Sequence, residues 1–128
     1  MILIRMQEPR QRARRWRETS MKRIMVIETE ARARQALKSI LETAGYEVVV
    51  AVDGGDAQSR HSARPADLVI ADGIDDPPVG ARILAVPGGT DQRRAMLSER
   101  LRLSGAQTFL PKPFRRDDLL DAVRLSLA

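Results

Sequence analysis

The feature of this sequence that most constrains its fold is a short apolar run closed by carboxylates. The run covers Leu68–Ala71, lies between Asp67 and Asp72, and is rich in β-branched side chains. Its length and composition predict a strand that is buried on both faces, as in a parallel α/β sheet. Ligands of open parallel sheets bind at the carboxyl ends of the strands. Asp72 is therefore placed to be a phosphoryl acceptor, a metal ligand or the cap of a turn.

Strand and helix patterns alternate along the rest of the chain. Strands are predicted at residues 23–27, 46–52, 68–71, 82–86 and 108–110. Helices are predicted at residues 33–44, 53–63, 92–104 and 117–127, and Gly45 and Gly105 end two of them. Alternation of this kind predicts a parallel sheet with right-handed crossovers.

Composition narrows the class of protein. A chain of 128 residues is long enough for one domain with a core. The absence of cysteine excludes disulfides and thiolate metal sites. No apolar run approaches the roughly 18 residues of a membrane span, and the first four residues are too few for a signal peptide. We therefore expect a cytoplasmic protein without membrane contact.

The positive charge is concentrated at the start of the chain. The whole chain carries +5, residues 1–23 carry +6, and residues 24–128 carry −1. This predicts a basic arm over residues 1–21, followed by a domain at 22–128. The arm is either a contact for nucleic acid or for an acidic membrane surface, or a solvated extension. Trp16 is its one aromatic residue, so we favour the extension, and Met21 is an alternative start of the protein.

Six short stretches carry a family resemblance. They are residues 23–28 (RIMVIE), 41–48 (LETAGYEV), 53–54 (DG), 65–72 (PADLVIAD), 104–106 (SGA) and 109–114 (FLPKPF). In this order, over about residues 22–127, they resemble the receiver domain of bacterial two-component response regulators. The resemblance implies a flavodoxin-like α/β fold with a five-stranded parallel sheet of order 2-1-3-4-5.

The resemblance also implies a signalling role rather than enzymatic turnover. Asp72 matches the family's phosphoryl acceptor, whose donor is a histidine kinase or phosphotransfer protein. Lys112 matches the lysine that pairs with a phosphoryl oxygen, and the bond to Pro113 is usually cis in the family. The implied ligands for Mg²⁺ are Glu28, Asp72 and the backbone carbonyl of Ile74.

Three positions depart from the family pattern. Thr29 replaces the acid that normally contacts the ion, so Mg²⁺ binding is predicted to be weak or absent. Pro87 replaces a Ser or Thr whose hydroxyl bonds the phosphoryl group, and Thr90 lies three residues too late. Phe109 matches the aromatic switch residue but lacks a hydroxyl.

The connection before the fourth strand is short. Residues 73–82 are the only residues between Asp72 and Ile83, and they include Pro77 and Pro78. A parallel crossover usually needs a dozen residues or more, and proline breaks helices. The family's third helix, which joins the third and fourth strands, is therefore predicted to be missing or reduced. We expect the apolar surface of these strands to be uncovered, with a homodimer or protein partner on that face.

Each candidate also has a purely structural interpretation. Asp72 could cap a turn, Lys112 could compensate an acidic cluster of Glu28 and Asp72, and His61 fits a surface residue of a polar helix. Two hypotheses for function follow. The chain is either a single-domain receiver phosphorylated on Asp72, or a pseudo-receiver that acts as a protein-interaction module without phosphate.

Overall fold

The fold follows the predicted alternation of strands and helices, in a computed structural model that describes residues 21–128. The strands are β1 (Arg23–Ile27), β2 (Glu47–Ala51), β3 (Leu68–Ala71), β4 (Ile83–Ala85) and β5 (Thr108–Phe109). The helices are α2 (Ala31–Thr43), α3 (Gly54–Ala63), α4 (Asp91–Leu103) and α5 (Arg116–Leu127). Apart from Met21, the predicted basic arm lies outside the described residues, and the domain boundary stays a prediction.

The five strands form one parallel sheet in the order β2-β1-β3-β4-β5, which confirms the predicted fold class. β1 and β3 lie at the centre, where Val26 pairs with Val50 on one side and with Ile70 on the other. All four residues of β3 are buried, as the apolar run predicts. The carboxyl ends of β1 and β3 therefore meet at one edge of the sheet.

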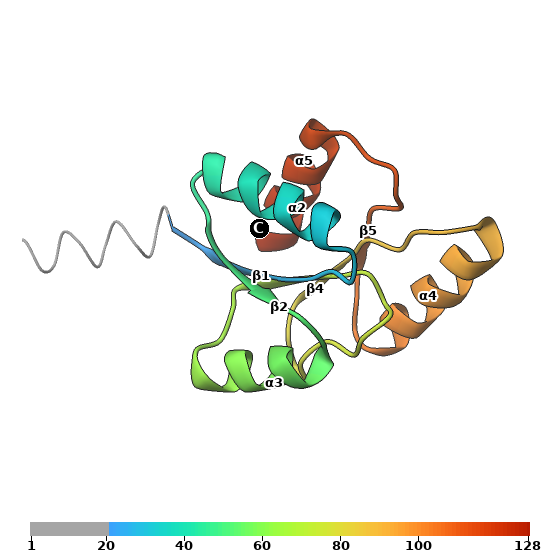
Figure 1. The fold of residues 1–128 in the computed structure, drawn as a ribbon, viewed down its shortest axis with the longest axis horizontal. Helices are drawn as coiled ribbons and strands as arrows, with labels where there is room; N and C mark the ends of the chain where they lie inside the picture. The colour runs from blue at the N-terminus through green and yellow to red at the C-terminus, as the bar shows by residue number, and fades with distance from the viewer. Residues whose placement is uncertain (1–20) are drawn as a thin grey trace, which may run out of the picture.

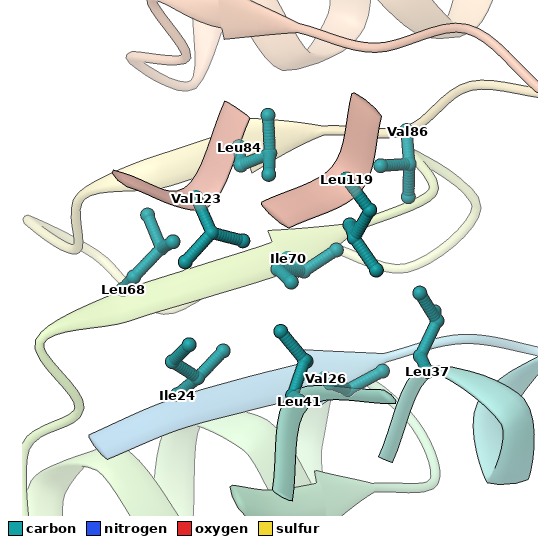
Figure 2. Packing of buried hydrophobic residues seen from close by; sticks show 10 residues of the cluster. All are labelled: Ile24, Val26, Leu37, Leu41, Leu68, Ile70, Leu84, Val86, Leu119 and Val123. Atoms are coloured by element: carbon teal, nitrogen blue, oxygen red, sulfur yellow. The ribbon is translucent and has the colours of Figure 1, made fainter. Parts of the chain in front are cut away.

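Each face of the sheet packs against its own helices. Figure 1 shows α2 and α5 on one side of the sheet and α3 on the other. The core below α2 and α5 is drawn in Figure 2 and consists of Ile24, Val26, Leu37, Leu41, Leu68, Ile70, Leu84, Val86, Leu119 and Val123. The opposite core consists of Met25, Ile27, Ala51, Ala57, Val69, Ala71, Ile83, Ala85, Leu101 and Ala106.

Local signals at the helix ends agree with the sequence. Asp53 caps α3, since its side chain accepts a hydrogen bond from the Asp56 N–H. Thr90 caps α4 in the same way, through the Arg93 N–H. Gly45, with a φ of 98°, follows α2 in the left-handed conformation that ends many helices.

The crossover from β3 to β4 contains no helix, as predicted. Instead, residues 73–82 form a strap that is tied to the helices on either side. Asp76 makes an ion pair with Arg100 of α4 at 2.7 Å, and the Val79 N–H donates to the Gln58 side chain of α3 at 3.2 Å. A Cβ at Gly54 would lie 3.0 Å from the Asp76 carbonyl oxygen, so the strap lies directly on the start of α3.

The expectation of uncovered apolar surface on β3 and β4 is wrong. Val69 and Ala71 of β3 have no exposed surface, and Ile83 of β4 is only 3% exposed. Leu97 and Leu101 of α4 lie against the backbone of Gly73, so α4 and the strap together cover the place of the missing helix. The prediction of a homodimer or protein partner on this face was based on that exposed apolar surface, so its basis is removed. No helix within residues 21–128 is long and apolar enough to cross a membrane.

Gly73 is predicted to be the glycine on which this cover most depends. Its φ is 96°, and a Cβ there would lie 3.1 Å from Leu97 and 3.2 Å from Leu101. Gly73→Ala should therefore lower the free energy of unfolding by about 2–4 kcal/mol, since left-handed strain and overpacking add. Gly80 has a φ of 78° with nothing within 4 Å, so Gly80→Ala should cost about 1 kcal/mol from strain alone. Urea unfolding compares the two, and equal losses would contradict the packing role.

Candidate functional site

A hollow of about 480 Å³ lies at the carboxyl edge of the sheet. Its lining includes four side chains that the sequence singled out, namely Glu28, Thr29, Asp72 and Lys112, together with Ile74. They come from the end of β1, the end of β3 and the loop after β5. The structure thus brings the predicted acceptor, lysine and metal ligands to one place. Its lining does not include the predicted switch residues Pro87 and Phe109.

Asp72 is buried, with 3% of its surface exposed, and protein donors hold both of its oxygens. Oδ2 accepts hydrogen bonds from the Thr29 N–H at 3.2 Å and the Thr29 hydroxyl at 3.0 Å. Oδ1 accepts from the Ile74 N–H at 3.0 Å. These three donors fix the orientation of the carboxylate. Thr29, which stands where the family has an acid, therefore donates hydrogen bonds to Asp72.

Lys112 makes its ion pair with Glu28 rather than with Asp72. Its Nζ lies 2.6 Å from Glu28 Oε2, and Glu28 is only 3% exposed. A buried carboxylate is costly unless it is paired, so this contact satisfies a requirement of the fold. The predicted role of Lys112 toward a phosphoryl oxygen stays a prediction. The prediction that it compensates an acidic cluster fits the observed contact.

The backbone of Lys112 is also firmly held. Its N–H donates to the Pro87 carbonyl at 2.9 Å, and its carbonyl accepts from Arg94 Nη1 at 2.7 Å. The Lys112–Pro113 peptide is cis, as the resemblance implies. These contacts join the loop after β5 to the end of β4 and to α4.

The hydroxyl that the family places at the end of β4 has no replacement here. Pro87 is buried and contributes its carbonyl to Lys112. The Thr90 hydroxyl caps α4, accepting from the Arg93 N–H at 3.2 Å, and Thr90 does not line the hollow. Phe109 is 37% exposed on the edge strand. Its predicted role as a switch stays a prediction.

Sequence reasoning missed two arginines beside the hollow. Arg34 of α2 donates through Nη1 to the Glu28 carbonyl at 2.8 Å, and Arg93 of α4 lines the hollow itself. The available signal was position, because each arginine lies near the start of a helix that follows a strand carboxyl end. Composition alone could not separate these two from the many other arginines of the chain.

Few oxygen ligands for a magnesium ion are free of protein partners in the hollow, and the weak or absent Mg²⁺ binding stays a prediction. Mg²⁺ requires several oxygen ligands in near-octahedral geometry. Within residues 21–128, no three acidic, histidine or cysteine side chains lie together in a way that could hold a metal. Of the two carboxylates, Glu28 is engaged by Lys112, and both oxygens of Asp72 accept hydrogen bonds from protein groups.

Comparison with known proteins gives the family context for this geometry. The transcriptional regulatory protein PdtaR of Mycobacterium tuberculosis, from strains CDC 1551 and H37Rv, is 34% identical over 117 residues. That match covers 84% of this chain and 57% of PdtaR, so the chain spans just over half the length of these relatives. No family model matches the chain.

Solved structures show the same fold. A CheY-like response regulator receiver domain protein of Methanospirillum hungatei superposes with a TM-score of 0.70 at 24% identity, over 84% of this chain and 94% of that one. A putative response regulator of Chloroflexus aurantiacus gives a TM-score of 0.71 at 21% identity, over 83% and 97%. The described sheet and its helices thus have the fold of a response regulator receiver domain, and the chain is similar in sequence to a protein of that kind.

Restoring an acid at position 29 should give this domain a magnesium site. Thr29→Asp removes the hydroxyl donor to Asp72 and adds a hard oxygen ligand beside Asp72 and Glu28. We expect Mg²⁺ to raise the free energy of unfolding of this variant, by about 2.7 kcal/mol at 100 times its Kd. The unsubstituted protein should show no such shift, and neither should Thr43→Asp, which places the same charge at the exposed end of α2. Equal Mg²⁺ stabilisation of all three proteins, measured by thermal unfolding and calorimetry, would contradict this prediction.

Proposed function

We propose that this chain acts in two-component signalling as a receiver that accepts a phosphoryl group on Asp72. The observation that carries the proposal is the hollow at the end of β3, where Asp72 and Lys112 line the same solvent-open space. A carboxylate and an ammonium group at one strand end supply a nucleophile and a charge partner for a phosphoryl group. The proposed donor is a histidine kinase or a phosphotransfer protein.

The proposed step is a substitution at phosphorus. An oxygen of Asp72 attacks the phosphorus atom of a phosphohistidine, and a new P–O bond forms as the P–N bond breaks. The imidazole nitrogen keeps the electron pair, so nothing is oxidised or reduced. When Oδ2 of Asp72 attacks, it becomes part of an acyl phosphate, and the Thr29 hydroxyl and N–H that held it become available to the phosphoryl oxygens. The long stem of Lys112 allows its ammonium group to exchange Glu28 for a phosphoryl oxygen.

A phosphorylation-independent protein-interaction module is the second candidate. It is favoured by the Glu28–Lys112 ion pair and by the three protein donors on Asp72, which satisfy the site without a ligand. In this case the receiver fold would present a fixed surface to a partner protein. The two candidates differ in whether Asp72 reacts with a phosphodonor.

Reaction with a small phosphodonor tests the primary proposal. Incubated with acetyl phosphate and Mg²⁺, the protein should gain the mass of one phosphoryl group by intact-mass spectrometry. Asp72→Asn should gain none, because an amide oxygen does not form a stable acyl phosphate. Asp75→Asn serves as the matched control, since Asp75 lies in the strap outside the lining of the hollow and should leave the mass gain intact. No mass gain in the unsubstituted protein would favour the phosphorylation-independent module.

A further inference from the structure

We propose that Arg93 supplies the positive charge that an incoming phosphoryl group needs at this site, in place of a magnesium ion. This inference rests on the proposed role of Asp72 as phosphoacceptor. It assigns Arg93 as a phosphoryl-binding residue whose guanidinium group contacts the oxygens of the group being transferred.

The position of Arg93 supports the assignment. It lies in the first turns of α4 and lines the same hollow as Asp72 and Lys112. Gly89 lets the arginine stem lie close against the loop before α4, because a Cβ at position 89 would lie 2.8 Å from Arg93 Cδ. The φ of Gly89 is 94°, a conformation that other residues rarely adopt. The loop and the arginine are therefore fitted to each other at the rim of the hollow.

The charges lining the hollow indicate why a further cation is needed. The carboxylates there are Glu28, Glu30 and Asp72, and the cations are Lys112 and Arg93. Lys112 is paired with Glu28 at 2.6 Å, so its move to a phosphoryl oxygen would leave the buried Glu28 carboxylate without its partner. A phosphoryl group that approaches Asp72 adds negative charge, and repulsion opposes the attack unless a cation contacts its oxygens.

Arg93 is better placed for this contact than the neighbouring arginines. Arg94 donates to Asp91 and to the Lys112 carbonyl, and Arg100 makes its ion pair with Asp76. Within residues 21–128, no side chain or carbonyl accepts a hydrogen bond from the Arg93 guanidinium group. Its planar fork of N–H donors can bind two phosphoryl oxygens at once.

Phosphorylation without divalent metal is the test. Acetyl phosphate is supplied in EDTA, and intact-mass spectrometry follows formation of the P–O bond to Asp72 as acetate leaves with the electron pair of its own P–O bond. We expect the unsubstituted protein to react in EDTA and Arg93→Gln to react about 100-fold more slowly, the usual effect of removing one preorganised charge partner. Arg93→Lys should recover part of the rate, because it keeps the charge without the bidentate fork.

Arg102→Gln is the matched control. Arg102 lies on the same helix, is exposed, and pairs with Glu99 outside the hollow, so its removal should leave the rate unchanged. Thermal unfolding should give the same midpoint for Arg93→Gln as for the unsubstituted protein, since Arg93 is exposed. A slower reaction of Arg93→Gln at an unchanged midpoint separates a role in phosphoryl binding from one in folding.

The outcomes separate this inference from the proposal on which it rests. If the protein is phosphorylated on Asp72 only when Mg²⁺ is present, or if Arg93→Gln reacts at the full rate, the role of Arg93 is overturned while Asp72 remains the acceptor. If the unsubstituted protein gains no phosphoryl group with or without Mg²⁺, both proposals are overturned. A metal-independent reaction that depends on Arg93 but not on Arg102 supports both.

Discussion

The arrangement of the site depends on the ion pair between Glu28 and Lys112. Glu28 is buried at the end of β1, and a buried carboxylate is tolerated only with a partner. Lys112, from the loop after β5, supplies that partner at 2.6 Å and thereby ties the centre of the sheet to its far edge. The family resemblance assigns Glu28 to the metal and Lys112 to the phosphoryl group. In this structure the two side chains are ion-pair partners of each other.

Thr29 complements this ion pair at the neighbouring carboxylate. Its hydroxyl and N–H hold one oxygen of Asp72, while the Ile74 N–H holds the other. A family acid at position 29 would instead repel Asp72 unless a cation lay between the two. The exchange of acid for hydroxyl therefore lets the site stay compact without an ion. The cations that line the hollow are Lys112 and Arg93.

Much of the fold could be predicted because its signals are local. The apolar run of β3, the helix start at Asp53, and the short strap before β4 each act within a few residues of sequence. The position of Asp72 in the hollow followed from β3 alone. The cover over β3 and β4 could not be predicted in this way, since it depends on where Leu97 and Leu101 of α4 come to lie. The ion pair between Lys112 and Glu28 joins residues 84 positions apart in the chain, so local patterns could not predict it. The same holds for the position of Arg93 in the lining of the hollow.

The strap between β3 and β4 has a consequence for selectivity among related proteins. Receiver domains of one cell share a fold, so a partner must tell them apart by their surfaces. Where a related domain presents a helix, this one presents residues 73–82, with two prolines and an exposed Val79. A partner that binds a helix at this place in other receiver domains would meet the strap and α4 here instead. The shortened crossover would thus lower the affinity of this face for the partners of other receiver domains, by a difference in shape rather than by repulsive charge.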